Sequence, residues 1–160
     1  MKPFLLLFAL CLTSTLVGCR GNLLHSDYAD LPHAQWDGQK PLLFDLPVVD
    51  EPWEGSLRVG VRTVKRFAYE QVVVRAEVLC DGERVEDWLL PVVTHHADQM
   101  CAADLLYEEF FSEQKPLRIE AGKRYTLRLT HRMRLNPLDN IASVGFDLQT
   151  QPTGLFDIHL

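Results

Sequence analysis

Residues 124–135 alternate strictly between polar and apolar side chains, and this pattern constrains the fold more than any other feature of the chain. One side of the segment carries Tyr125, Leu127, Leu129, His131, Met133 and Leu135. The other side carries Arg124, Thr126, Arg128, Thr130, Arg132 and Arg134. Because successive side chains of a strand point to opposite faces of a sheet, the pattern predicts a strand with one face in a core and one in solvent.

The same period of two recurs elsewhere in the chain. Further strands are expected at 42–46, 57–63, 71–80, 84–93, 117–120, 141–149 and 155–158. The turn-forming pair Asp81-Gly82 makes residues 71–93 a predicted β-hairpin. Pro91 has no backbone N–H to donate to a ladder, so its part of the hairpin is expected at a sheet edge or a bulge.

Residues 97–113 do not follow the period of two. Met100, Asp104, Tyr107 and Phe111 recur at helical spacing, so a short helix and an extended loop both remain open. About seven or eight short strands with at most one short helix predict an all-β fold. We expect two antiparallel sheets packed as a β-sandwich of jelly-roll type.

The N-terminus has the pattern of a lipoprotein signal. The apolar run at 4–12 is far shorter than the roughly 20 residues of a membrane-spanning helix, so it is interpreted as part of a removable signal peptide. Leu16-Val17-Gly18-Cys19 then has the form of a lipobox, in which a small residue precedes the cysteine. We predict a signal peptide at 1–18 and a lipid on Cys19 that anchors the protein to a membrane.

The residues after Cys19 bear on location and organisation. Arg20-Gly21-Asn22 lacks the aspartate that often retains lipoproteins in the inner membrane, so we predict an outer-membrane anchor that faces the periplasm. Residues 19–39 show little apolar periodicity and are expected to form a lipidated tether, followed by a single β-sandwich domain at 40–160. Removing Lys2 with the signal leaves 15 basic and 22 acidic residues, a net charge of −7 that argues against nucleic-acid binding.

Two cysteines, Cys80 and Cys101, remain in the body of the mature chain. The oxidising periplasm permits a disulfide between them. Two buried free thiols are the alternative, because the sequence does not show that the Cα atoms lie within the roughly 7 Å that a bridge requires.

Residues 116–149 resemble the C-terminal half of the gliding-motility lipoprotein GldH family of Bacteroidetes. The resemblance rests on Gly122 with Tyr125, on the segment His131-Arg132-Met133-Arg134, on Leu138 and on Ile141–Gly145, together with the lipobox. It implies an envelope lipoprotein of a family that gliding species require for movement over surfaces and that non-gliding relatives also contain. It implies no catalytic residue and no ligand.

A metal site is the first candidate for chemistry. His95, His96 and Asp98, with Cys101 and His131 elsewhere, carry suitable ligand atoms. Adjacent histidines on a strand point to opposite faces, however, and the spacing matches no common zinc pattern. Exposed loop histidines are therefore the preferred interpretation, and we expect no metal and no cofactor.

Catalysis is the second candidate. The acidic pairs Asp50-Glu51 and Glu108-Glu109 would suit a glycosidase only at a defined carboxylate separation, and adjacent acids are more typical of solvated turns. The chain has no glycine-rich phosphate loop and no serine nucleophile elbow. We therefore expect a protein that is not an enzyme.

The arginines of the 124–135 segment are a candidate surface for an anionic partner. Arg124, Arg128, Arg132 and Arg134 share its polar side, an uneven distribution in an acidic protein. Bidentate contacts would suit a carboxylate-rich protein surface or an acidic polysaccharide. The alternative is a solvated face. There these arginines, with Arg58 and Arg62 of another strand, would pair internally with acids such as Glu77, Glu120 and Asp147.

Trp36, Trp53 and Trp88 are the remaining candidates, either as a sugar-stacking platform or as packing residues. Our leading hypothesis is a non-catalytic accessory lipoprotein of the envelope that acts through contact with unknown envelope proteins. The alternative is a lipid-anchored carbohydrate-binding β-sandwich. Two coplanar, exposed tryptophans on one face would favour the alternative.

Overall fold

The computed structural model describes residues 22–64, 67–94 and 107–150. The elements in chain order are β1 (Leu23–Asp30), the short 3-10 helix η2 (Pro32–Ala34), β2 (Gln35–Trp36), β3 (Leu42–Asp45), β4 (Trp53–Val64), β5 (Gln71–Cys80), β6 (Glu83–Val93), β7 (Tyr107–Phe111), β8 (Lys115–Ile119), β9 (Tyr125–His131), β10 (Leu138–Asp139) and β11 (Ile141–Thr150).

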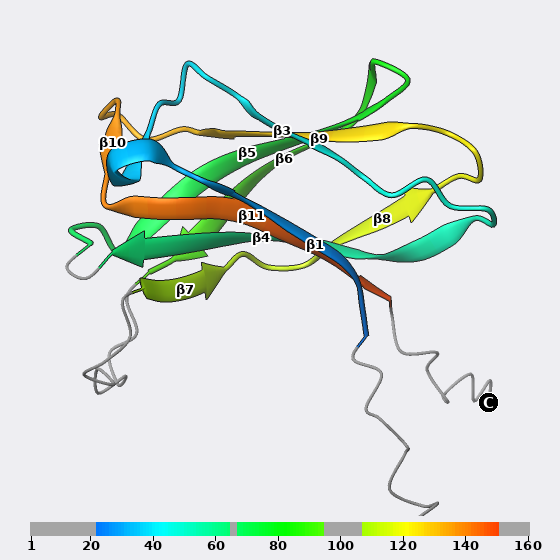
Figure 1. Cartoon of the computed structure of the whole chain (residues 1–160), viewed down its shortest axis with the longest axis horizontal. Helices are drawn as coiled ribbons and strands as arrows, with labels where there is room; N and C mark the ends of the chain where they lie inside the picture. Colours follow the sequence, from blue (N-terminus) through cyan, green and yellow to red (C-terminus); the bar gives the residue numbers. More distant parts are fainter. Residues whose placement is uncertain (1–21, 65–66, 95–106, 151–160) are drawn as a thin grey trace, which may run out of the picture.

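The strands form two antiparallel layers (Figure 1). One sheet has the order β1-β11-β4-β7, with β8 also paired to β4. The other has the order β3-β9-β5-β6, and the two-residue strands β2 and β10 pair separately. This arrangement confirms the predicted all-β sandwich. None of the described elements is a helix long and apolar enough to cross a bilayer.

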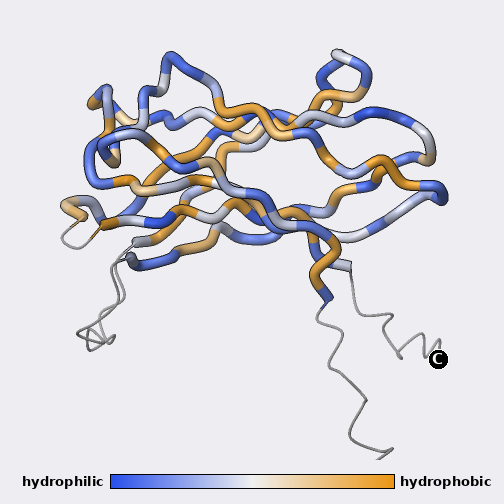
Figure 2. The backbone as a smooth tube through the Cα atoms, in the orientation of Figure 1, coloured by the Kyte–Doolittle hydropathy of each residue, from blue (hydrophilic) through white to orange (hydrophobic). Residues whose placement is uncertain are grey.

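The core lies between the two layers and follows from the alternation in the sequence. The inward side chains of β4, β5, β9 and β11 are fully buried, and hydrophobic and hydrophilic segments alternate along the strands (Figure 2). The fully buried members are Leu57, Val59, Val61, Val72, Val74, Ala76, Val78, Leu127, Leu129, Ile141, Val144, Phe146 and Leu148. Burial of these apolar rows is the main source of stability, since each large aliphatic side chain contributes about 1.5–3 kcal/mol.

The predicted hairpin at 71–93 is confirmed as β5 and β6. Its turn has positive φ angles at Asp81 (49°) and Gly82 (91°), as a tight hairpin turn requires. The strand β6 lies at the edge of its sheet. The carbonyl of Val73, which pairs with Pro91, accepts a hydrogen bond from Arg132 on the other side of β5, so Pro91 stands where the β5–β6 ladder needs no N–H.

The predicted tether is wrong for residues 23–39. The strand β1 pairs with β11 from Leu23 opposite Gln149 to Asp30 opposite Ser143, and Trp36 is 1% exposed in the core. A β-bulge at Leu24 interrupts the register, so β1 lacks the alternation that marks the other strands. The sandwich therefore begins at β1, whereas the predicted signal peptide and Cys19 lie outside the described residues.

Other boundaries also differ from the prediction. The described part of the chain contains eleven strands, because long-range backbone pairing adds short strands that have no strong pattern of their own. The strand β9 ends at His131, and Leu135 is exposed beyond it. Residues 107–111 form the edge strand β7, neither helix nor loop, while 97–106 and 155–158 lie outside the described residues.

Candidate functional site

Among the described residues, the outer side of the sheet β3-β9-β5-β6 carries the densest group of ion-paired side chains. Alternation places these side chains there, because their neighbours along β5 and β9 point into the core. We call this group the arginine face. It consists of Arg75, Glu77, Arg84, Asp87, Leu89, Arg128 and Arg132.

Glu77 is the centre of the arginine face. It lies opposite Arg128 in the β5–β9 ladder, and that guanidinium donates from Nε to Oε2 and from Nη2 to Oε1, each at 2.8 Å. Arg84 Nη1 donates to the same Oε1 at 3.1 Å, and Arg75 Nη2 lies 3.5 Å from it. The hydrogen bonds from Arg128 lower the pKa of Glu77 and outweigh the opposing effect of burial.

A second carboxylate, Asp87, lies opposite Glu77 on β6. Arg75 donates two hydrogen bonds to it, from Nε to Oδ1 at 2.9 Å and from Nη2 to Oδ2 at 2.7 Å. The same contact raises the pKa of Arg75 and lowers that of Asp87. Both groups therefore stay charged at neutral pH. The two parallel hydrogen bonds between the planar guanidinium and the carboxylate hold both side chains in one orientation.

Arg132 differs from the other arginines of this face. It follows the last residue of β9, and its backbone N–H donates to the carbonyl of Val73 at 2.8 Å. Its guanidinium makes no hydrogen bond or ion pair with any other residue in the described ranges. Together with Arg75, Asp87 and Leu89 it lines a shallow hollow of about 380 Å³, and Leu89 is 62% exposed.

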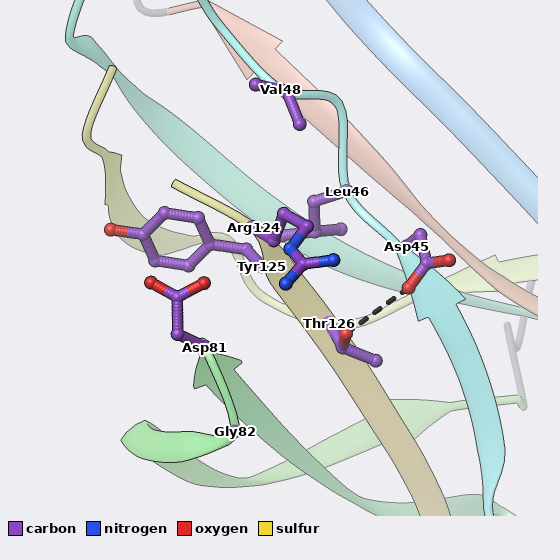
Figure 3. A pocket seen from close by; sticks show the side chains of 8 residues that line it. All are labelled: Asp45, Leu46, Val48, Asp81, Gly82, Arg124, Tyr125 and Thr126. Carbon is purple, nitrogen blue, oxygen red and sulfur yellow. Dashed lines mark hydrogen bonds between the residues drawn. The ribbon is translucent and has the colours of Figure 1, made fainter. Parts of the chain in front are cut away.

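The four arginines expected on one strand do not form one row. Only Arg128 belongs to β9, because the strand begins at Tyr125 and ends at His131. Arg124 lines a separate hollow of about 440 Å³ at the end of the sandwich. Figure 3 shows it there with Asp45, Asp81 and Thr126. Arg134 is exposed beyond the strand.

Arg58 and Arg62 lie on β4, in the opposite sheet, and do not extend the arginine face. Arg58 donates two hydrogen bonds to Asp147, at 2.9 and 2.7 Å, and its guanidinium carbon lies 3.7 Å from the ring centroid of Phe111. Arg62 pairs with Glu109 at 2.9 Å. The expected internal pairing therefore holds for these arginines and for Arg128 with Glu77. Glu120 pairs instead with Lys123.

The tryptophans do not form a shared platform. Trp36 is buried in the core, where its ring and that of His131 pack in a T-shaped arrangement with centroids 5.2 Å apart. Trp53 lies on β4 and Trp88 on β6, in different sheets, and both are partly buried against the core. The carbohydrate-binding hypothesis therefore lacks the exposed, coplanar pair that would favour it.

The residues considered as metal ligands are only partly described. His131 is buried, its Nε2 lies 3.0 Å from the carbonyl of Trp36, and its Nδ1 accepts the backbone N–H of Met133 at 3.3 Å. It therefore serves as a packing residue that links the end of β9 to β2. The other candidates, His95, His96, Asp98 and Cys101, lie outside the described residues. Within the described ranges, no group of three or more His, Cys, Asp or Glu side chains is placed to hold a metal ion.

The predicted disulfide stays a prediction. Cys80 ends β5 and is partly exposed, whereas Cys101 lies outside the described residues. Of the two acidic pairs considered for catalysis, Glu108-Glu109 lies on β7, where Glu109 forms an ion pair with Arg62. The other pair, Asp50-Glu51, lies in the loop between β3 and β4.

Comparison with known proteins gives one strong match. The family model of the GldH lipoproteins matches residues 24–148, which confirms the resemblance noted at 116–149 and extends it over nearly all described residues. No curated protein matches the chain.

Two solved structures are distantly similar to the chain. A CocE/NonD family hydrolase from Staphylococcus aureus is 8% identical, with a TM-score of 0.40, and the match covers 80% of this chain and 33% of that chain. This chain thus spans about a third of the length of that hydrolase. A family 35 carbohydrate binding module from an environmental isolate is 12% identical, with a TM-score of 0.35, over 81% of this chain and 82% of that chain. At these scores neither likeness supports a functional conclusion.

Proposed function

This chain belongs to the GldH lipoprotein family, and from that premise we propose that it is a non-catalytic accessory protein of the cell envelope that binds another envelope protein. Membership of a lipoprotein family supports a membrane-anchored location in the envelope. The lipobox supports a lipid on Cys19, and the residues after it favour the outer membrane with the body facing the periplasm.

The hollow around Arg132 is the observation that carries the proposed contact. Arg132 presents a guanidinium with no partner in the described ranges, and it lines the same hollow as the exposed side chain of Leu89. The charged members of the arginine face are four arginines and two carboxylates, so it is locally basic on a mature chain whose expected net charge is −7. A partner that offers a carboxylate next to an aliphatic side chain would satisfy both groups.

Two other arginines of the arginine face are already paired, and one of them, Arg75, lines the hollow. Arg75 and Arg128 are each held by two hydrogen bonds to a carboxylate, so their side chains are ordered before any partner arrives. Pre-ordered side chains lower the entropy lost on binding. We therefore assign recognition of the partner protein to Arg132 and Leu89.

Charge reversal at one position tests this proposal. Arg132→Glu leaves the Glu77 network intact, and Arg134→Glu is a matched control on an exposed arginine beyond the strand. We expect both variants to accumulate normally in the membrane fraction. After crosslinking in living cells, Arg132→Glu should lose envelope proteins that the wild type and Arg134→Glu still capture. A normal set of captured proteins for Arg132→Glu would reject the arginine face as the contact surface.

A further inference from the structure

The sandwich begins very close to the predicted lipid. The carbonyl of Asn22 already accepts a hydrogen bond from the backbone N–H of Thr150 at 2.7 Å, and β1 starts at Leu23. Asn22 is three residues after Cys19. Because an extended chain spans at most about 3.3–3.6 Å per residue, the start of the sandwich lies within roughly 10 Å of a lipidated cysteine.

Three apolar side chains lie near this starting point. Leu23 is 52% exposed and Leu24, the extra residue of the β-bulge, is 42% exposed. The indole Nε1 of Trp53 donates to Oγ1 of Thr150 at 3.3 Å. Thr150 is the residue whose backbone N–H binds Asn22, so the Trp53 ring lies beside the start of the sandwich. We call Leu23, Leu24 and Trp53 the anchor patch.

The position of Trp53 is set by the fold. A Cβ atom added to Gly55 would lie 2.3 Å from the Trp53 ring, so the indole packs directly on the glycine backbone. The start of β1 and the end of β11 lie at the same end of the sandwich as the β3–β4 and β8–β9 connections (Figure 1). The anchor patch thus occupies the end of the molecule that the lipid would hold near the bilayer.

We propose that the anchor patch contacts the bilayer surface beside the lipid, so that the sandwich lies against the membrane and is not separated from it by a long linker. This inference rests on the proposed lipid at Cys19. Tryptophan is enriched at membrane–water interfaces, where its ring meets the acyl boundary and its N–H meets polar groups. Exposed leucines next to one lipid anchor add apolar area to the same contact.

Fluorescence quenching by brominated lipids tests the contact. The processed full-length protein is reconstituted into vesicles of phosphatidylethanolamine and phosphatidylglycerol with plain or brominated acyl chains. Brominated chains should reduce the tryptophan emission of the wild type. Trp53→Phe should abolish this loss, and Trp88→Phe should retain it because Trp88 lies on β6 in the other sheet.

A second pair of variants leaves all tryptophans in place. Leu24→Asp should weaken the quenching, whereas Leu43→Asp, at an exposed leucine of β3 in the other sheet, should not. Mass spectrometry of the N-terminal peptide separates the two claims. Acylated, vesicle-bound protein whose emission is unquenched, or whose quenching survives Trp53→Phe, overturns the anchor patch alone. A Cys19 without acyl chains overturns both the lipid anchor and the patch.

Discussion

The carboxylate of Glu77 accepts two parallel hydrogen bonds from the guanidinium of Arg128, although only 3% of the Glu77 surface is exposed. A buried carboxylate is tolerated only when its oxygens are well paired. Because Glu77 lies on β5 and Arg128 on β9, the contact holds two central strands in register and organises the arginine face above them.

Truncation of Arg128 should therefore destabilise the fold. Arg128→Ala removes two hydrogen bonds from a buried carboxylate and leaves it with only the longer contacts from Arg84 and Arg75. We expect the free energy of unfolding, measured in urea, to fall by about 1–3 kcal/mol. Arg134→Ala, at an exposed arginine beyond the strand, should change it by less than about 0.5 kcal/mol. Equal losses in the two variants would contradict the assigned role of Arg128.

The same contact predicts a pH dependence of stability. The pKa of Glu77 is lowered in the folded state from its ordinary value of 4.5, mainly by the hydrogen bonds from Arg128. Its contribution is therefore complete above about pH 4.5 and is lost as the pH falls through the lower folded pKa. Urea unfolding at a series of pH values should show a shallower acid decline for Glu77→Gln than for the wild type. Parallel curves would show that Glu77 does not contribute.

A pair of glycines in the other sheet predicts a double-mutant effect. Gly60 and Gly145 face each other across β4 and β11, and Tyr28 lies over both. The atoms nearest to a Cβ on Gly60 belong to the Tyr28 side chain, with Oη at 2.1 Å, whereas the atom nearest to a Cβ on Gly145 is the Asp27 backbone oxygen at 2.2 Å.

Gly60→Ala should therefore cost about 1–3 kcal/mol of stability in the wild type and much less in a Tyr28→Ala background. Gly145→Ala should be destabilising in both backgrounds, because a backbone atom cannot move aside as a side chain can. The three single variants and the two double variants that contain Tyr28→Ala are compared with the wild type by thermal unfolding. Relief of Gly145→Ala by Tyr28→Ala would be inconsistent with this packing.

The strong strands could be predicted from the sequence because their side chains face two different environments. The alternation at 57–63, 72–78 and 141–149 reports directly on burial, and each of these segments is a strand. The strand β1 could not be predicted, because its bulge at Leu24 shifts the side chains out of phase and its stability comes from backbone pairing with β11. Backbone hydrogen bonds to another strand do not depend on side-chain type, so they do not produce a polar–apolar pattern in the sequence of one strand.

The arginine face was only partly predictable for a related reason. Its central pair, Glu77 with Arg128, was among the pairings expected, but the contribution of Asp87 depends on hairpin register. A regular two-residue turn would place Glu86 opposite Glu77, and the register shift between Val78 and Leu79 places Asp87 there instead. Nor can alternation alone show that Arg58 belongs to the opposite sheet.

The lipid anchor predicts a clear change in fractionation. Cys19→Ser removes the thiol that accepts the lipid, so the variant should remain an uncleaved precursor or become a soluble protein. Metabolic labelling with a fatty acid and separation of membrane and soluble fractions measure both outcomes. Normal labelling and membrane recovery of Cys19→Ser would contradict lipidation at this position.

The contact between the arginine face and an envelope protein is tested most directly by a photoreactive residue at Leu89, placed in the otherwise intact protein in its native cells. The account predicts a discrete crosslinked product from this position that is absent when Arg132→Glu is added. The same probe at Tyr107, an exposed residue of β7 in the opposite sheet, should not give this product. A folded, abundant protein that yields no crosslinked partner from Leu89, or the same product with Arg132→Glu, would contradict it.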